Sequence, residues 1–560
     1  MVTVQNLNSY ENTAIMQYEE KGVVQATPLL CFREEKGSVK VSDVYRLAKP
    51  RKKGLLRLIF SRFFVIVLLL IAQILITISL YAWLKDMFPY LSGFIMVFTI
   101  CGVIYLFNSG MDSAAKLSWM FIIAIVPITG VAFLAFTKTN IGNRKVRRRV
   151  DELIGMTKDA LEQPAGVREK LEADTSGTDD LVKYLNRSGC FPVYDRTEAT
   201  YFPLGENMFD ALLKELEKAE KFIFMEFFII DEGYMWGSIL KILEEKAKNG
   251  VDVRVMYDGM LEVSTLPSNY CKLLQEHGIQ AKVFSPIRPL VSSHYNYRDH
   301  RKIVVIDGKV AFTGGVNLAD EYINRIERFG HWKDVGLMLK GDAAASFTLL
   351  FLQMWNITEK EAVFEPWLNA PSDLPGVPSG YVIPYGDCPL DNDKVGEAVY
   401  MDILNRAVDY VHIMTPYLIL DGELETALKY AAQRGVDVKL ILPGIPDKKL
   451  AFALAKSHYK RLVEAGVKIY EYTPGFVHAK VFTSDDKKAV VGTINLDYRS
   501  LYHHFECAAY MYKTACIPDI ERDFQETLAK CREVTPESIK NEKFFYKAAG
   551  SLIQFIAPLM

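Results

Sequence analysis

The sequence predicts an α/β protein in which one α/β unit occurs twice, preceded by an N-terminal α-helical transmembrane segment. Three observations support this class: three apolar runs near the N-terminus, β-rich runs that alternate with amphipathic helices after them, and a motif that recurs with identical spacing. At 560 residues the chain is also too long for one compact core. We therefore expect a membrane part joined to two folded units.

The composition is consistent with that division. Hydrophobic residues make up 50% of the chain and charged residues 24%, and the mean hydropathy is slightly positive. The formal net charge of -2 argues against a protein that binds nucleic acid over its whole surface. None of the eight cysteines forms a CxxC pair and no Cys/His cluster has zinc spacing, so neither a structural metal nor a disulfide framework is expected.

The N-terminal part consists of a polar and basic extension, 1–58, and a predicted transmembrane region, 59–137. Three apolar runs, 63–83, 90–107 and 117–136, each approach the roughly 20 residues that a helix needs to cross the hydrocarbon core. The first run starts too far into the chain for a secretory signal peptide, so we expect the runs to remain as anchors.

Basic residues flank the apolar runs, in segments 46–62 and 138–149. The positive-inside rule places both segments in the cytoplasm, which requires an even number of crossings, whereas three full spans would separate them. The middle run is the shortest and contains Ser92, Gly93 and Gly102, which favours a re-entrant or interfacial course. The sequence thus predicts a multi-pass protein of the cell membrane and favours a cytoplasmic position for its soluble part.

The soluble part follows a basic and polar connector, 138–180, and divides into two similar units, 181–368 and 381–560. In each unit amphipathic helices precede strand-like runs, and the strand NGVDVRVMYDG of the first unit is echoed by RGVDVKLILPG in the second. The segment between them, 369–380, is rich in Pro, Gly and Ser and is therefore a predicted linker.

Each unit contains the motif H-x-K-x4-D-x6-G-[GT]-x-N. The first copy consists of His300, Lys302, Asp307, Gly314, Gly315 and Asn317, and the second of His478, Lys480, Asp485, Gly492, Thr493 and Asn495. Two copies at corresponding places of a duplicated unit argue strongly against a chance match.

The spacing places each His and its Lys on one face of a strand, because side chains at i and i+2 point the same way. Asp307 and Asp485 fall at the turn after that strand, where Asp commonly binds backbone groups, so within the motif we give both a structural role. The returning strand ends in small residues, which let an anion approach the backbone and place Asn317 and Asn495 beside the His–Lys pairs.

Two imidazoles, two ammonium groups and two carboxamides suit a negatively charged phosphodiester. The Lys and Asn side chains can orient and neutralise the non-bridging oxygens. One neutral His can attack phosphorus while the other, protonated, supplies a proton to the leaving alkoxide. The predicted catalytic set is therefore the His, Lys and Asp of both motifs, and no metal or cofactor is expected.

The doubled motif resembles that of the phospholipase D superfamily, and three segments resemble the bacterial cardiolipin synthases within it. These segments are NYRDHRKIVVIDGKVAFTGGVNLADEY, RFGHWKDVGL and INLDYRSLYHHFE. The resemblance extends from about Phe63 to the C-terminus. It implies tandem phospholipase D-type domains, each a mixed sheet flanked by helices, which pack about a pseudo-twofold axis and join both motifs in one active site.

The resemblance also implies roles for individual residues. His300 would be the nucleophile that forms a phosphatidyl-histidine intermediate, and His478 would act as acid and then as base, although the residues alone do not decide which His attacks. A carboxylate beyond each motif, Asp334 or Glu506, would orient the His of its own motif.

Two further features lie outside the motifs. The pair His503 and His504 stands where the family usually has apolar residues or Asn, which leaves the details of the second half of the site open. Glu226 lies between Met225 and Phe227 in an apolar strand, where an unpaired carboxylate is costly. We expect Glu226 to point into the active-site cleft or to pair with a nearby cation.

The implied reaction is transfer of a phosphatidyl group from one phosphatidylglycerol to a hydroxyl of another, which yields cardiolipin and glycerol. The expected partners are phospholipid and the membrane, without nucleic acid, and the sequence gives no oligomeric state. Alternatives are a membrane-bound phospholipase that hydrolyses phospholipid, a synthase with phosphatidylethanolamine as donor, a nuclease, and a non-catalytic membrane scaffold. A nuclease predicts a basic groove and a scaffold degenerate motifs, whereas the net charge is near zero and both motifs are complete.

Overall fold

A computed structural model gives the chain from Val44 to Met560 as one compact unit. It describes residues 45–48, 75, 79, 88–138, 143–174, 176–189, 191–286, 297–368, 374, 376, 378–391, 393–555 and 557–559. Most of the predicted extension 1–58, most of the apolar run 63–83 and most of the predicted linker 369–380 lie outside the described residues.

The second and third apolar runs form the helices α3 (Phe88–Phe107), α4 (Ser113–Ile125) and α5 (Pro127–Lys138). The run 117–136, predicted as one span, is thus divided, because Pro127 has no N–H to continue a helix and begins α5 instead. Asp112 caps α4 by accepting a hydrogen bond from the backbone N–H of Ala115 at 2.9 Å. Among the helices that the structure describes, none combines the length and the apolarity of a membrane span.

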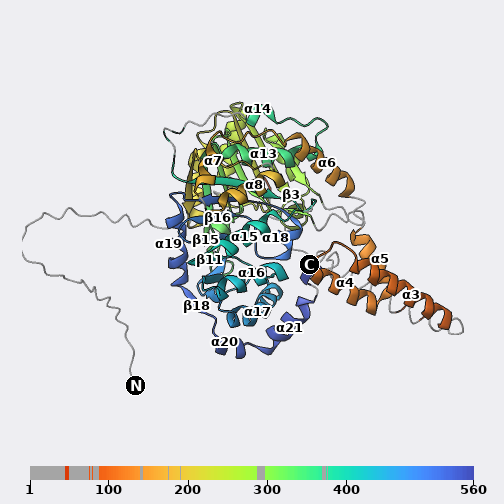
Figure 1. The fold of residues 1–560 in the computed structure, drawn as a ribbon. Helices are drawn as coiled ribbons and strands as arrows, with labels where there is room; N and C mark the ends of the chain where they lie inside the picture. The colour runs from red at the N-terminus through yellow and green to blue at the C-terminus, as the bar shows by residue number, and fades with distance from the viewer. Residues whose placement is uncertain are drawn as a thin grey trace, which may run out of the picture. The chain divides into compact units, whose positions relative to one another are not determined.

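Three helices lead from this region to the first sheet: α6 (Asn143–Met156), α7 (Val167–Ala173) and α8 (Thr178–Gly189). The first half of the soluble part then forms a seven-stranded mixed sheet in the order β1-β9-β7-β6-β2-β3-β4 (Figure 1). Its strands are β1 (Thr197–Phe202), β2 (Phe222–Phe227), β3 (Asp252–Asp258), β4 (Gln280–Phe284), β6 (Lys302–Ile306), β7 (Val310–Gly314) and β9 (Gly336–Gly341). β2, β3 and β4 run parallel, and the other neighbours are antiparallel.

The second half repeats this strand order as β10-β17-β16-β15-β11-β12-β13 and adds β18 at the edge. Its strands are β10 (Tyr381–Asp387), β11 (Tyr410–Met414), β12 (Asp437–Pro443), β13 (Lys468–Tyr472), β15 (Val481–Ser484), β16 (Lys488–Gly492), β17 (His504–Tyr512) and β18 (Cys531–Glu533). β11, β12 and β13 are again parallel. The predicted duplication of one α/β unit is therefore confirmed.

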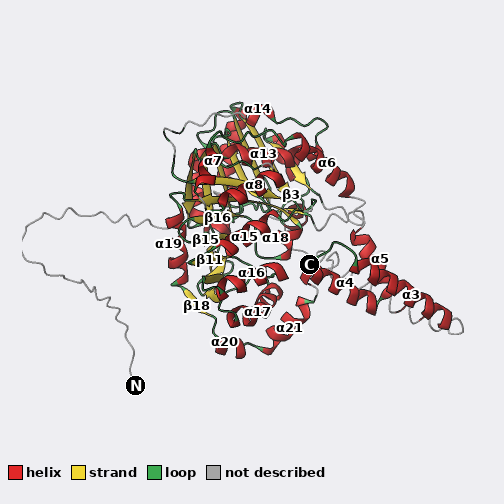
Figure 2. Ribbon diagram, viewed as in Figure 1, coloured by secondary structure: helices red, strands yellow, loops and turns green. Residues whose placement is uncertain are grey.

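Helices alternate with the strands in both halves (Figure 2). The first half contains α9 (Gly205–Leu216), α10 (Tyr234–Lys248), α11 (Met260–Ser264), α12 (Tyr270–Glu276), α13 (Ala344–Trp355) and α14 (Glu365–Leu368). The second contains α15 (Val395–Arg406), α16 (Gly422–Gln433), α17 (Lys449–Glu464), α18 (Tyr498–Tyr502), α19 (Ile517–Leu528), α20 (Pro536–Lys540) and α21 (Phe544–Gln554). Glu425 of α16 joins this helix to α17, because it accepts a hydrogen bond from Arg461 of α17. Lys429 of its own helix also donates to Glu425.

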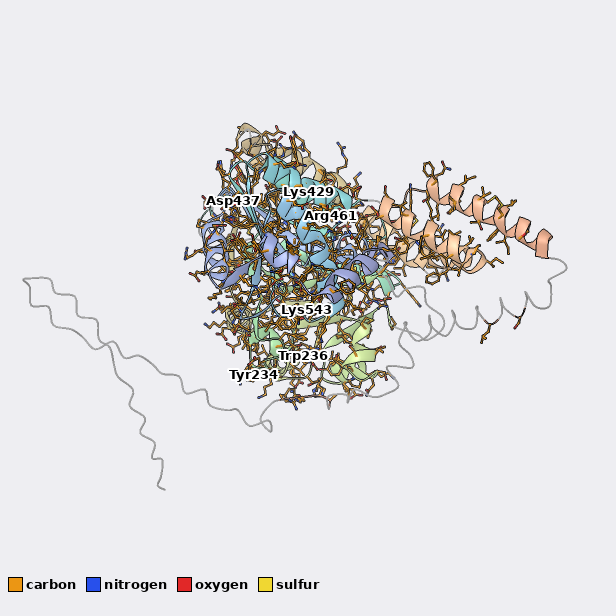
Figure 3. The ribbon with its side chains drawn as sticks, turned by 90° about the horizontal axis from the view of Figure 1, so that it is seen from below. Tyr234, Trp236, Lys429, Asp437, Arg461 and Lys543 are labelled. Carbon is orange, nitrogen blue, oxygen red and sulfur yellow. The ribbon has the colours of Figure 1, made fainter. Side chains whose placement is uncertain are left out.

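One apolar core is shared by the two halves. Phe224 and Ile303 of the first sheet belong to the same buried cluster as Ile413 and Val490 of the second. A separate cluster lies on the other face of the first sheet and includes Trp236 of α10 (Figure 3). The two halves therefore share part of their apolar core, to which α13 contributes Phe351 against Phe224 of the first sheet.

Two short parallel pairings cross between the halves. β5 (Arg298–Asp299) of the first half pairs with β17 of the second, so that Arg298 lies opposite His504. β14 (Gly475–Val477) of the second half pairs with β8 (His331–Lys333) of the first. Each crossing strand directly precedes a motif His, which places both motifs at the junction of the two halves.

Candidate active site

Each motif His is held through its backbone by the opposite half of the protein. His300 follows β5, and its N–H donates to the carbonyl of Phe505 at 2.9 Å. His478 follows β14, and its N–H donates to the carbonyl of Lys333 at 2.7 Å. This reciprocity is the local consequence of the crossing strand pairs, and it fixes both imidazoles at one junction.

The orienting carboxylates also cross between the halves. Nδ1 of His300 lies 2.9 Å from both carboxylate oxygens of Glu506, and Nδ1 of His478 lies 2.7 Å from Oδ2 of Asp334. The expectation that each carboxylate orients the His of its own motif is therefore wrong. The reason is the pairing of strands between the halves. Glu506 lies in β17, which pairs with β5, the strand that leads into His300. Asp334 follows β8, which pairs with β14, the strand that leads into His478.

A carboxylate on Nδ1 sets the chemistry of the imidazole. It accepts a hydrogen bond from Nδ1–H, so the neutral ring presents a lone pair on Nε2. The same carboxylate stabilises the ring when it becomes positively charged. Both imidazoles are thus prepared to attack phosphorus or to exchange a proton through Nε2.

Burial and positive charge set the protonation of the site. Burial lowers the pKa of His300 well below its usual value and that of His478 to about 4, and the lysine charges add to both effects. Burial also lowers the pKa of Lys302 to about 8 and that of Lys480 to about 7. The charge of Lys480 also lowers the pKa of His300, and the charge of Lys302 lowers that of His478. The two motifs therefore share one site.

The two motif lysines lie beside the histidines of their own motifs. Nζ of Lys302 donates to the carbonyl oxygen of His300 at 2.5 Å, and Nζ of Lys480 donates to that of His478. Both ammonium groups are almost fully buried, which strengthens their attraction for an anion. A bound phosphodiester would in turn favour the charged form of each lysine.

The two motif asparagines have unequal surroundings. Asn317 accepts a hydrogen bond from the N–H of Ile229 at 3.1 Å and donates to the hydroxyl of Tyr322 at 2.8 Å. Its amide is therefore already occupied by groups of the protein. Asn495 is buried, and its Oδ1 has no hydrogen-bond partner in the described part of the chain. Of the two predicted orienting amides, Asn495 is the better placed for a ligand.

Asp307 and Asp485 lie at turns, as the motif spacing predicted. Asp307 accepts hydrogen bonds of 2.7 to 2.9 Å from the backbone N–H groups of residues 220–222. Asp485 does the same for residues 408–410, at 2.9 to 3.0 Å. Both carboxylates are therefore occupied in fixing the start of a central strand and are not positioned for proton transfer.

Glu226 is fully buried in β2, and its carboxyl oxygens are shut off from solvent. Burial raises the pKa of Glu226 well above its usual value, the neighbouring Asp299 raises it further, and Arg301 opposes this. Of the two expectations for Glu226, the structure supplies the nearby cation, Arg301, whose charge favours the ionised carboxylate. The position in the active-site cleft stays a prediction.

Two motif positions prove to hold the orienting carboxylates, a role that the sequence did not indicate. The hydroxyl of Thr493 donates to Oε2 of Glu506. Gly315, at the corresponding position of the first motif, lies so close to Asp334 that a Cβ would be 1.9 Å from Oδ1. The sequence offered one signal for this role: the two copies of the motif differ in the second residue of G-[GT], which is Gly315 in the first copy and Thr493 in the second.

Aromatic rings form the walls beside the imidazoles. The ring centroids of Phe228 and His504 lie 5.0 and 5.3 Å from that of His300. Those of Tyr322 and Trp332 lie 5.3 and 5.6 Å from that of His478. His504, where the sequence departs from the family pattern, thus lies against the imidazole of His300.

Two groups of side chains within the described residues have the composition of a metal site. They are His300, His504 and Glu506, and a second group of Glu397, Asp421 and Glu423. In the second group Lys394 lies 3.3 Å from Glu397, and Asp421 accepts a hydrogen bond from Tyr502. Glu397 and Asp421 therefore already have partners, whereas the first group overlaps the first motif.

The fold and site together define an enzyme of the phospholipase D superfamily: two halves of one topology, each contributing a His and a Lys to a single site for a phosphodiester. A family model described as the phospholipase D-like domain of cardiolipin synthase matches residues 212–355 and 400–528. Among solved structures, phosphatidylserine synthase of Haemophilus influenzae is similar in fold, with a TM-score of 0.52 at 15% identity over 68% of this chain and 97% of that chain.

Relatives in sequence narrow the class. Cardiolipin synthases of Geobacillus kaustophilus and Alkalihalophilus pseudofirmus are 32% and 31% identical; they cover 84% and 83% of this chain and 94% and 93% of their own lengths. An uncharacterized protein of Streptococcus mutans is 58% identical over 82% of this chain and 100% of its own. The chain belongs to the cardiolipin synthase family, and it is a phosphatidyltransferase by that membership.

Proposed function

We propose that this enzyme makes cardiolipin and glycerol from two molecules of phosphatidylglycerol, with His300 as the nucleophile and His478 as the proton-transfer residue. The single observation that carries the proposal is the reciprocal pairing of His300 with Glu506 and of His478 with Asp334. This pairing gives two aimed imidazoles at one junction, as a double displacement at phosphorus requires.

In the first step Nε2 of His300 attacks the phosphorus of one phosphatidylglycerol. The bond from phosphorus to the glycerol oxygen breaks, and the Nε2 proton of cationic His478 passes to that oxygen. In the free protein burial lowers the pKa of His478 to about 4. The bound phosphate anion must therefore raise this pKa before His478 can act as an acid.

In the second step His478, now neutral, removes the proton from a hydroxyl of the second phosphatidylglycerol. The hydroxyl oxygen attacks phosphorus, and the bond from phosphorus to Nε2 of His300 breaks. Lys302 and Lys480 neutralise the non-bridging oxygens in both steps. The buried setting of the site favours a lipid hydroxyl over water as the acceptor.

We also propose that the region 59–137 anchors the enzyme at the cell membrane, with the domains 181–368 and 381–560 on the cytoplasmic side. Large apolar side chains are exposed along α3 and α4, among them Phe94, Met96 and Phe121. Exposed apolar surface of this kind suits contact with lipid, which brings both substrates to the site without extraction into water.

The test is to supply the purified full-length protein with phosphatidylglycerol vesicles alone, without metal or nucleotide, and to resolve the products by mass spectrometry. We expect cardiolipin and glycerol. His300→Ala and His478→Ala should each reduce turnover at least about 10³-fold while the thermal unfolding curve is retained. His277→Asn, at a half-buried histidine outside the motifs that contacts Glu244, serves as the control. Phosphatidic acid as the main product would indicate a hydrolase, and the absence of both lipid products would refute the lipid assignment.

A further inference from the structure

His504 is a buried imidazole for which the proposed mechanism has no use. It is 8% exposed, and neither of its ring nitrogens has a hydrogen-bond partner among the described residues. Its ring lies against that of His300, with centroids 5.3 Å apart, and its Nδ1 lies 3.7 Å from Oε1 of Glu506. Burial of unpaired polar atoms costs free energy, so this position indicates a further ligand.

The neighbours of His504 supply a complete set of metal ligands. One ligand atom from each of His300, His504 and Glu506 lies within 4.8 Å of the other two. Two imidazole nitrogens and one carboxylate oxygen suit a borderline divalent ion such as Zn²⁺. With metal bonds of about 2.1 Å, tetrahedral ligand atoms are about 3.4 Å apart, so ligand atoms at the 4.8 Å limit have to approach each other by about 1.4 Å.

We propose that His300, His504 and Glu506 form an inhibitory site for a divalent transition-metal ion of the Zn²⁺ type. The corresponding position beside His478 and Asp334 is occupied by Trp332, whose ring offers no metal-ligand atom, so the other motif lacks the third ligand. The carboxylate of Glu506 attracts the ion, while the ammonium groups of Lys302 and Lys480 oppose it. We therefore expect the site to fill at elevated metal concentration and to empty when the ion is chelated.

Inhibition follows from the chemistry of the His300 ring, and this part rests on the proposed function. Nδ1 of His300 faces Glu506, so the ion binds at Nδ1 and takes the position of the proton shared there. The single proton of the neutral ring then moves to Nε2, which no longer carries a lone pair. Without that lone pair Nε2 cannot form a bond to phosphorus.

Metal binding is measured first, with the full-length protein after treatment with a chelator. Co²⁺ is the probe, because its visible absorption intensifies in a four-coordinate site. We expect one equivalent to bind to the wild type and to His503→Asn, the matched control on the adjacent residue. His504→Asn should bind at least tenfold more weakly, and His504→Gln provides a second variant if the first does not fold.

Inhibition is measured next, with ZnCl2 titrated into phosphatidylglycerol vesicles and the enzyme. The concentration of Zn²⁺ that halves turnover should rise at least tenfold in His504→Asn and stay unchanged in His503→Asn, and addition of EDTA should restore the activity of the wild type. Equal Co²⁺ binding or equal Zn²⁺ inhibition in wild type and His504→Asn would overturn the proposal. If the wild type makes no cardiolipin but His504→Asn still binds Co²⁺ more weakly than the wild type does, the metal site stands and only the proposed function is refuted.

Discussion

The two motif imidazoles are held by carboxylates of different length, and one motif residue in each half accounts for the difference. Gly315 leaves room for the short Asp334, whose carboxylate occupies the space that a side chain would fill. Thr493 stands at the corresponding position and donates its hydroxyl to the longer Glu506. Each pair positions the imidazole of the opposite motif, so a change in one half is expected to affect chemistry in the other.

Gly315→Ala tests this arrangement. The new Cβ would lie 1.9 Å from Oδ1 of Asp334 and 2.9 Å from the carbonyl oxygen of His478, so both groups must move. A displacement of about 1 Å in a reacting group can lower a rate about 100-fold. We expect kcat for cardiolipin formation to fall by at least that factor, with a smaller change in KM.

The matched control is Gly422→Ala, because a Cβ at Gly422 has no atom within 4 Å. This variant should retain wild-type kcat, and both variants should show cooperative thermal unfolding. A wild-type rate in Gly315→Ala would show that Asp334 does not position His478.

At the scale of elements, the motif aspartates act as anchors for strands. Asp307 and Asp485 adopt left-handed backbone conformations, with φ of 54° and 53°, at the turns that follow β6 and β15. Each side chain binds three successive N–H groups at the start of a neighbouring central strand, β2 or β11. The conserved spacing within the two copies thus reflects a structural need as well as a chemical one.

Asp307→Ala and Asp485→Ala should therefore reduce stability and leave the chemical step largely intact. Loss of one such carboxylate leaves three backbone donors without their partner, and we expect a decrease of about 1–3 kcal/mol in the free energy of unfolding. The measurement is urea unfolding, together with kcat at a temperature where each variant is folded. Asp409→Ala removes an exposed carboxylate from the same region and is the control. A kcat below one hundredth of the wild type in a folded Asp307→Ala would instead indicate a role in proton transfer.

Sequence alone predicted the motif positions but not their partners. The i, i+2 spacing correctly placed Lys302 beside His300, and turn chemistry correctly placed Asp307, because both depend on neighbours in the chain. The assignment of Glu506 to its own motif was wrong, because β5 and β17 are far apart in sequence and their pairing is decided by tertiary packing. The division of the run 117–136 depended on one local residue, Pro127, and was accessible to prediction.

At the scale of the whole molecule, the halves share their core as well as their catalytic groups. Buried side chains from both sheets form one cluster, and each catalytic imidazole takes its carboxylate from the other half. We therefore expect unfolding of the soluble part to be cooperative, with the active site lost in the same transition. Several histidines are buried at this junction, and burial disfavours their charged form.

Acid should destabilise the whole protein through these histidines. Burial lowers the pKa of His478 and His503 to about 4, that of His504 to about 3, and that of His300 well below its usual value of 6.5. Below pH 6.5 these histidines consequently bind more protons in the unfolded chain than in the folded one. Their contribution to stability is full above pH 6.5 and is lost as the pH falls towards 4, by up to about 1.4 kcal/mol per pH unit for each histidine.

His503→Asn isolates one of these contributions, because His503 has no place in the proposed chemistry. Its midpoint temperature should fall less steeply than that of the wild type between pH 6.5 and pH 4.5, since one group fewer takes up a proton on unfolding. Scanning calorimetry over this range measures the difference, and His277→Asn is the control for loss of a half-buried imidazole outside the junction. Parallel curves for His503→Asn and the wild type would show that the buried histidines do not cause the acid sensitivity, and carboxylates would then have to account for it.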